Sequence, residues 1–303
     1  LKAYMGGKFY LGMMTVHSLR VKRKKRHGNR SVAGTCGIFV FLLILGMFMM
    51  LPLLYAIVSS LKPLDELYIY PPRFFVNRPT FDNIKQLFTL AANLWVPFSR
   101  YVFNSLFVSV VATVGHIIIA SMCAFAFSKY NIRIRWMFNV IQTALLFNGT
   151  VLWLPQYVIM AKLGLLNTYW GYIFPILPMP LGLFLMKQFM DQLPTTLIEA
   201  AEIDGATAFT IFRKIVMSTV KPAWLTLMVF AFQSVWNSNP QGVVFDEQLK
   251  LLQSAISEIV SSGISRVGVS MAGSLFIMIP PILIFVFSQN SVIETMAHSG
   301  IKD

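Results

Sequence analysis

The sequence predicts an all-α integral membrane protein with six transmembrane helices and both termini in the cytoplasm. Hydrophobic residues make up 56% of the 303 residues and charged residues only 12%, with a mean hydropathy of +0.66. So few polar side chains could not cover a soluble globule of this length. Six apolar stretches each approach or exceed the roughly 20 residues that cross about 30 Å of hydrocarbon.

The six predicted spans form one domain, 32–303, that follows a basic amino-terminal segment, 1–31. They cover residues 34–61, 101–128, 136–161, 168–186, 222–238 and 267–292. Proline, which removes a backbone donor, interrupts the later spans at Pro155 in the third, at Pro175, Pro178 and Pro180 in the fourth, and at Pro280 and Pro281 in the sixth. Freed carbonyls are tolerated at membrane depth only against protein or water. Each proline site therefore either borders a water-filled path or is a kink that fits the packing.

The basic residues determine the predicted orientation, because Lys and Arg are retained on the cytoplasmic side during insertion. With the amino terminus inside, the inner segments hold 17 of the 25 Lys and Arg residues, including the run at 22–26. Because this run stands directly before a span, we interpret it as a topology anchor at anionic headgroups rather than a nucleic-acid patch. Both termini are therefore expected in the cytoplasm.

Several kinds of site have no motif in this sequence. It contains no G-x-x-x-x-G-K-[ST] loop for ATP phosphates and no H-E-x-x-H zinc motif, and the predicted spans carry no Lys, Arg or Asp. We therefore expect no catalytic residue, cofactor or metal in this chain. His116 lies within a span without neighbours at ligand spacing, so it is expected to be packed or to face a pore. Any energy input must come from a partner.

The segment 190–220, between the fourth and fifth predicted spans, has the features of a docking loop. Pro194 and the pair Thr196 and Glu199 predict a helix start with a capping box. Gly205 can adopt a left-handed turn, and Asp204 is placed to cap the next helix. Helical spacing gives a small apolar face before the glycine and a second helix after it, from Ile198, Ala200, Ala201 and Ile203 and then Phe209, Phe212 and Ile215. Periodicity alone fits equally well an interfacial helix on the inner leaflet.

This loop also carries a family pattern. Glu199-Ala200-Ala201, three residues, Gly205, nine residues and Ile215 resemble the EAA loop of ABC importer permeases, whose short coupling helix sits in a groove of the cytoplasmic ATPase. An ordered set of further motifs resembles the MalG-like permeases of carbohydrate importers over nearly all of 32–303. They include Ser60-Leu61-Lys62-Pro63, Pro79-Thr80-Phe81-Asp82-Asn83, Leu163-Gly164-Leu165-Leu166-Asn167, Ile203-Asp204-Gly205-Ala206 and Trp236-Asn237.

The resemblance implies a type I ABC importer permease fold in a bacterial cytoplasmic membrane and import of an oligosaccharide by alternating access. It implies as partners a second homologous permease, two ATPase subunits that bind ATP and Mg, and an extracytoplasmic solute-binding protein. Carried onto this sequence, Glu199 would contact the ATPase, Ala200 and Ala201 would permit close approach, and Gly205 would allow the turn. Asp204 and Ile215 belong to the same coupling set.

Two positions depart from the family pattern. Met217-Ser218 stands where the family loop ends in Leu-Pro, so the second helix is expected to pass motion into the fifth span with different rigidity. The tail 299–303 only approximates the small-residue family ending, which weakens the case for a carboxyl-terminal contact with the ATPase.

A saccharide path needs amide and aromatic side chains without strong charge. The predicted path residues are Asn148, Gln233, Trp236 and Asn237, chosen from a set that also includes Gln142, Trp153, Gln156 and Tyr157. Each has a rival interpretation as an interhelical hydrogen bond. The texture most resembles permeases for polysaccharides, including alginate-derived and other uronate oligosaccharides. An ion-coupled secondary sugar carrier and a non-transporting membrane scaffold are the alternatives.

Two outer loops, 62–100 and 239–265, are expected to be ordered. In the second, Asp246 and Glu247 are expected in the first turn of an amphipathic helix whose apolar face would be Leu249, Leu252, Ala255, Ile256, Ile259 and Val260. The helix is expected to lie flat on the outer leaflet, and the resemblance implies, compatibly with this, that the loop can reach the solute-binding protein.

Overall fold

The computed structural model describes residues 32–130, 135–147, 149–240, 242–261 and 266–300, and within these ranges it is helical with no strand. One compact part of the chain ends at Leu51 and a second runs from Pro52. In chain order the elements are α1 (Val32–Ser60), α2 (Leu64–Leu67), α3 (Asp82–Ala92), α4 (Phe98–Lys129), α5 (Arg135–Ala144), α6 (Gly149–Lys162), α7 (Trp170–Ile173), α8 (Pro180–Asp191), α9 (Thr195–Ile203), α10 (Ala208–Thr210), η1 (Ile211–Val216), α11 (Met217–Thr219), α12 (Lys221–Trp236), η2 (Glu247–Leu249), α13 (Leu252–Ser261) and α14 (Val267–Gly300). The predicted basic segment 1–31 and the residues 301–303 lie outside the described ranges.

Three described helices are long and apolar enough to cross a membrane: Gly34–Ser60, Phe98–Lys129 and Val267–Asn290. Two bent pairs bring the number to as many as five if each pair is one span. The expected continuous span at 136–161 is instead α5 and α6, which meet at 112°. The span at 168–186 is also not one helix, because prolines interrupt it between α7 and α8. Six spans with cytoplasmic termini therefore stay a prediction.

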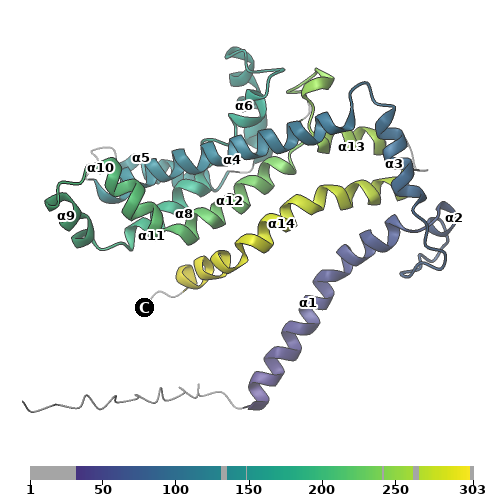
Figure 1. Cartoon of the computed structure of the whole chain (residues 1–303), viewed down its shortest axis with the longest axis horizontal. Coiled ribbons are helices and arrows are strands. Elements are labelled where there is room, and N and C mark those ends of the chain that lie inside the picture. Colours follow the sequence, from purple (N-terminus) through teal and green to yellow (C-terminus); the bar gives the residue numbers. More distant parts are fainter. Residues whose placement is uncertain (1–31, 131–134, 148, 241, 262–265, 301–303) are drawn as a thin grey trace, which may run out of the picture. The chain divides into compact units, whose positions relative to one another are not determined.

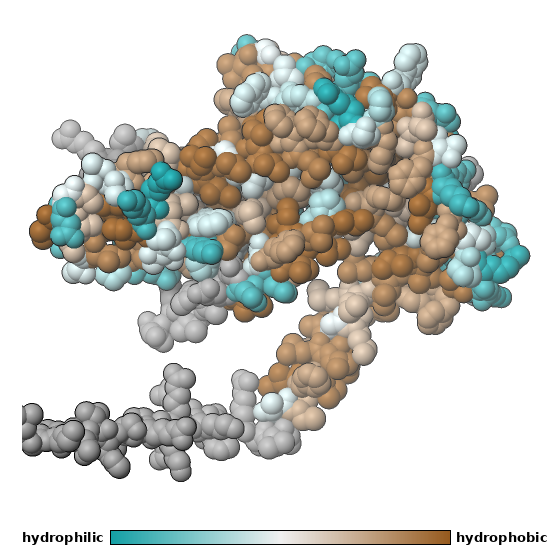
Figure 2. Space-filling model, viewed as in Figure 1, coloured by the Kyte–Doolittle hydropathy of each residue, from teal (hydrophilic) through white to brown (hydrophobic). Residues whose placement is uncertain are grey.

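The part of the chain from Pro52 onward is organised around α4. Figure 1 shows α12 running beside α4, and α14 packs along α12. The buried face of α4, which also contacts α8, consists largely of small and polar side chains such as Ser105, Ser109, Ala112 and Thr113. In Figure 2 hydrophobic residues cover the middle of these helices, while hydrophilic residues gather near α2. Small residues allow the helix backbones to approach closely, as in other membrane bundles.

His116, on α4, satisfies a backbone carbonyl in the proline-rich break between α7 and α8. Its Nδ1 lies 3.0 Å from the carbonyl oxygen of Leu177 and must donate, because a carbonyl only accepts. The ring is fully buried, and a Cβ added to Gly182 on α8 would collide with its Nε2. Of the two expected environments for His116, the structure shows the packed one.

The first outer loop folds back on the end of α1. Asn83 on α3 donates from Nδ2 to the carbonyl oxygens of Ser60, at 2.9 Å, and Lys62, at 2.7 Å. The buried Glu66 accepts from the backbone N–H groups of Asn77 and Arg78 at 3.0 Å each, and Lys62 donates to the carbonyl of Arg73. The expectation that this loop is ordered is confirmed within the described residues.

The second outer loop is held to α4 by side chains from early in the sequence. Asn104 donates to the carbonyls of Gln248 and Lys250, at 2.8 and 3.0 Å, and Ser105 accepts from the backbone N–H of Leu252 at 2.7 Å. These contacts hold 250–251 outside a helix, so the expected start at 246–247 was wrong. Asp246 instead caps the short turn η2, and α13 begins at Leu252.

The apolar face of α13 packs on the protein rather than on a lipid leaflet. Leu252, Ala255, Ile256 and Ile259 are buried. They contact core residues that include Tyr101 and Ala272. An orientation with this face on the outer leaflet is therefore wrong.

Glu247 and Lys250 form an ion pair that anchors this loop. The Glu247 carboxylate lies 2.6 Å from Lys250 Nζ and accepts from the Tyr101 hydroxyl at 2.6 Å, while Lys250 also pairs with Glu258. Burial alone would raise the pKa of Glu247, but the hydrogen bonds from Lys250 and Tyr101 hold it below its usual range. Burial likewise opposes the charge of Lys250, yet its two carboxylate partners raise its pKa.

Acid pH should weaken the attachment of this loop to α4. Because the folded pKa of Glu247 is depressed, its stabilisation is complete above the unfolded value of about 4.3 and is lost as pH falls through the folded value. We expect the protection of amides in 242–261, measured by mass spectrometry after short pulses and corrected for the intrinsic exchange rate at each pH, to fall below about pH 4. Glu247→Gln should exchange faster already at pH 7 and change less with pH; identical pH profiles for the two chains would contradict the assignment.

Substitution of Gly182 should destabilise the contact between α4 and α8. In Gly182→Ala the added methyl group must displace His116 and its hydrogen bond to Leu177, at a cost of about 1 to 3 kcal/mol. A fall in melting temperature of the purified chain in detergent would report it. Gly46→Ala on α1, where nothing lies within 4 Å of the added atom, is the matched control and should not melt earlier. Equal melting of both variants would contradict the packing described.

Candidate functional site

The predicted docking loop forms two short helices that meet at Gly205. The first, α9, begins at Thr195 after Pro194, whose extended ψ of 133° precedes the helix. No side chain caps this start, so the expected capping box of Thr196 and Glu199 was wrong. Thr196 lies inside the first turn of α9, and Pro194 is the residue that directly precedes the helix.

Gly205 ends α9 in the left-handed conformation that the sequence predicts, with φ of +79°. Its N–H donates to the carbonyl of Glu202 at 3.0 Å, and the N–H of Ala206 donates to the carbonyl of Ala201 at 2.9 Å. This pair of bonds is a Schellman motif, which satisfies the last carbonyls of the helix. Open space surrounds the glycine, so its backbone angle rather than crowding requires glycine here.

The helix after Gly205 is capped by Thr207, not by Asp204. The hydroxyl of Thr207 accepts from the backbone N–H of Thr210 at 3.3 Å, whereas Asp204 is the C-cap of α9, directly after its last residue Ile203. From Ala208 to Thr219 the chain stays helical through a π-helical turn, η1, that contains Ile215. A bend of 80° then leads into α12. The predicted second helix is thus confirmed, with a different cap.

At Met217-Ser218 the second helix continues without the interruption that a proline would cause. Ser218 donates to the carbonyls of Lys214 and Ile215, at 2.7 and 2.8 Å, and Thr219 donates to Ile215 at 2.8 Å. The bend falls at Val220, the N-cap of α12, two residues before Pro222 in the first turn of that helix. The chain therefore bends between these two helices without a proline at position 218.

The predicted apolar face of α9 is divided between two surroundings. Ala201 is 9% exposed and, together with the partly buried Ile198, packs into the core cluster beneath the loop. Glu199 and Ala200 are exposed, and Ile203 is 86% exposed. Phe209, in the second helix, is 66% exposed. The loop therefore exposes a large apolar side chain on each side of Gly205.

The predicted path residues differ in their exposure, and their role in a path stays a prediction. Trp236 is 3% exposed, and its Nε1 donates to the carbonyl of Ile277 on α14 at 2.8 Å. This is the interhelical hydrogen bond that the rival interpretation expects. Gln233 is half-buried and Asn237 exposed on the same end of α12, while Asn148 lies outside the described residues. Of the wider set, Gln142 and Trp153 are exposed and Gln156 and Tyr157 half-buried.

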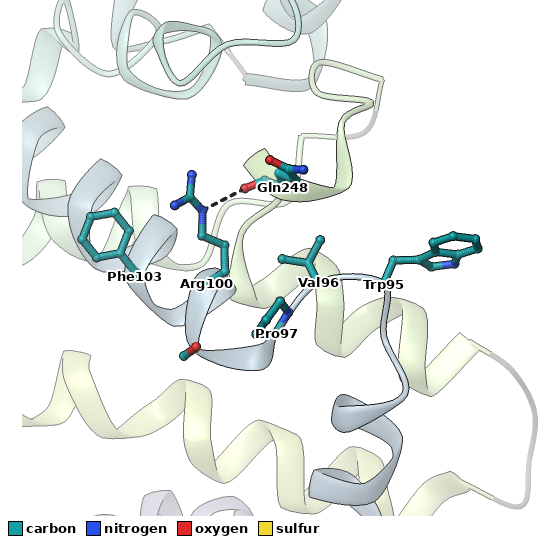
Figure 3. Close-up of a pocket in the computed structure, with 7 residues that line it drawn as sticks. Trp95, Val96, Pro97, Arg100, Phe103 and Gln248 are labelled. Atoms are coloured by element: carbon teal, nitrogen blue, oxygen red, sulfur yellow. Dashed lines mark hydrogen bonds between the residues drawn. The ribbon is translucent and has the colours of Figure 1, made fainter.

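A shallow cavity of about 660 Å³ lies where α4 begins, between Trp95 and Phe103 (Figure 3). Arg100 reaches across it to the carbonyl of Gln248, with Nε at 3.4 Å, and its guanidinium lies 5.9 Å from the ring centre of Phe103. The ring of Trp95 points away from Arg100 and is 97% exposed. An aromatic and a cationic side chain thus line this surface without converging on a common ligand.

Curated relatives align over most of this chain. The arabinooligosaccharides transport system permease protein AraQ of Halalkalibacterium halodurans is 28% identical over 273 residues, covering 87% of this chain and 94% of AraQ. The polygalacturonan/rhamnogalacturonan transport system permease protein YtcP of Bacillus subtilis is 28% identical over 288 residues, covering 88% and 96%.

A solved structure shares the fold. It is the crystal structure of a bacterial ABC transporter involved in the import of the acidic polysaccharide alginate. One of its chains superposes with a TM-score of 0.67 at 22% identity, covering 87% of this chain and 99% of that one. Residues 105–297, which include the whole docking loop, match the family model of the binding-protein-dependent transport system inner membrane component. The protein therefore belongs to the family of binding-protein-dependent transport system inner membrane components, the permease family that the loop pattern indicated.

Proposed function

We propose that this chain is a permease subunit of an ABC importer in the bacterial cytoplasmic membrane and moves an oligosaccharide inward by alternating access. The family match over 105–297 is the observation that carries the proposal. The names of AraQ and YtcP, both saccharide transport permeases, support a saccharide as cargo. In this proposal six spans cross the membrane and both termini are cytoplasmic.

The partners follow from the architecture of such importers. A second, homologous permease would complete the pathway, two ATPase subunits would hydrolyse ATP with Mg, and a solute-binding protein would deliver the cargo from outside. The structure of the alginate transporter with a pentasaccharide-bound periplasmic protein supports the last of these. The exposed side chains of Glu199, Ala200, Ile203 and Phe209 would dock in the ATPase.

The bend between α11 and α12 gives this docking a mechanical consequence. Because the chain is helical from Ala208 to Thr219 and again from Lys221 to Trp236, a displacement of the loop would tilt α12 rather than be absorbed in flexible residues. Ile215 lies in the π-helical turn and packs against the core, so it would link the loop to the bundle.

For the cargo we propose a uronate-containing oligosaccharide, such as one derived from alginate. The support is the name of YtcP and the shared fold with the alginate importer. Outer charge contributes little, since Arg78 and Lys250 are paired with carboxylates and Lys62 is buried. Selectivity would rest mainly with the binding protein.

The alternatives are an ion-coupled secondary sugar carrier and a membrane scaffold. A carrier would need ionisable groups within its spans for the coupling ion. The predicted spans carry no Lys, Arg or Asp. A scaffold would have no need of a bent helical loop between its spans. Purification in mild detergent separates these classes, because only the importer brings along an ATPase and a second permease.

Substitution of Gly205 should uncouple the transporter. A β-branched residue in the left-handed conformation costs at least about 1 to 2 kcal/mol, so Gly205→Val should reorient α9 and reduce stimulated ATP hydrolysis about tenfold while melting of the membrane domain stays unchanged. Gly205→Asn tolerates the same backbone angles and is the matched control. ATP hydrolysis by the reconstituted complex would be measured; equal activity of the two variants would argue against a coupling role for the turn.

The cargo class is testable with the complex purified together with its binding protein. Unsaturated uronate oligosaccharides should stimulate ATP hydrolysis severalfold more than neutral arabino-oligosaccharides of the same length. Stronger stimulation by the neutral series would leave an importer with a different cargo. A chain that purifies with no ATPase would overturn the importer itself.

A further inference from the structure

α14 contains a break in its hydrogen bonding that another helix repairs. Pro281 has no N–H, so the carbonyl of Ile277, four residues earlier, loses its helical donor. A carbonyl at membrane depth that is left without a partner is costly, because no water replaces the lost bond. The break therefore needs a donor from elsewhere in the protein.

Trp236, in the last turn of α12, supplies that donor. Its Nε1 lies 2.8 Å from the carbonyl oxygen of Ile277, and its indole ring is 3% exposed and stacks on Phe232 at 5.6 Å with 14° between the planes. The stacking fixes the ring, so the donor has one direction. The bond joins α12 to α14 at the point where α14 has lost its own internal support.

A second tryptophan holds the other end of α12. The Nε1 of Trp224 donates to the carbonyl of Met217 at 3.1 Å, across the 80° bend between α11 and α12. One helix thus carries an indole bond at each end, the first to the segment that continues from the docking loop and the second to the proline break of α14. α12 and α14 pack against each other along their length (Figure 1).

We propose that Trp236 is a positioning residue that transmits tilting of α12 to α14, so that α14 bends at Ile277–Pro281 when the docking loop moves. This inference rests on the proposed function, because it needs an ATPase to move the loop. Hinges in helices fall where a proline has removed a bond, and here the freed carbonyl is held by the helix that would move. If the hydrogen bond only fixed the packing of the resting state, loss of the Trp236 donor would lower stability but would not change the stimulation of ATP hydrolysis.

The test compares Trp236→Phe with the wild-type chain in the complete transporter, reconstituted in nanodiscs with its binding protein. Phenylalanine keeps the ring stacked on Phe232 and removes only the donor. We expect basal ATP hydrolysis to remain and the ratio of stimulated to basal hydrolysis to fall about five- to tenfold, the size of one buried hydrogen bond. Trp170→Phe on α7, whose ring is 53% exposed, is the matched control and should leave the ratio unchanged.

A double substitution tests the specific bond. Pro281→Ala restores a backbone N–H that can donate to the carbonyl of Ile277, so in that background Trp236→Phe should have little further effect. An equal fall of the ratio in both backgrounds, or no fall in either, would overturn the proposal. If the transporter that carries Trp236→Phe does not assemble, Pro281→Ala alone tests the proposal, because this variant retains the indole of Trp236 and stiffens the hinge. It should lower the ratio, and an unchanged ratio would count against the hinge.

The proposal and the function it rests on can fail separately. If the wild-type complex contains no ATPase, both fail together. If the wild-type complex is stimulated by its loaded binding protein and Trp236→Phe behaves identically, only the role of Trp236 fails.

Discussion

Every backbone carbonyl within a bilayer must find a donor inside the protein, and this requirement organises the second part of the chain. Pro281 frees the carbonyl of Ile277 within α14, the carbonyl of Leu177 lies in the break between α7 and α8, and buried side chains from α4 and α12 supply the donors. His116 and Trp236 therefore do structurally what a continuous helix would do for itself. The bundle accommodates broken helices because side chains of α4 and α12 donate hydrogen bonds to their free carbonyls.

The loop at 190–220 is connected to the far end of α12 through a series of defined turns and helices. The Schellman motif at Gly205 fixes the direction of α9, Thr207 fixes the start of the next helix, and the bend at Val220 leads directly into α12. At its far end α12 meets α14, which in turn packs on α13 and α3. A continuous series of packed helices thus runs from Ile203 to α13 and α3.

The sequence predicts well what depends on local composition. The long apolar helices follow from length and hydropathy, and the turn at Gly205 follows from the one residue type that enters the left-handed region freely. It predicts poorly what depends on distant partners. The late start of α13 is caused by Asn104 and Ser105, nearly 150 residues earlier, and the burial of Trp236 is explained by a proline on another helix. The sequence predicts that Asp204 caps the second helix, because its side chain is a suitable acceptor, but the backbone geometry places Thr207 at that position.

The polar face of α4 has a consequence for the synthesis and membrane insertion of this protein. α4 is made before α8 and α12, yet Asn104 and His116 receive their partners only from chain that follows them by some 60 to 150 residues. During synthesis the helix must therefore wait in the membrane, or beside the insertion machinery, with its polar side uncovered. The small and hydroxyl-bearing residues that later allow close packing make that interval tolerable, because each exposes little polar surface to lipid. The architecture that serves the finished permease thus also sets the order in which its helices can come together.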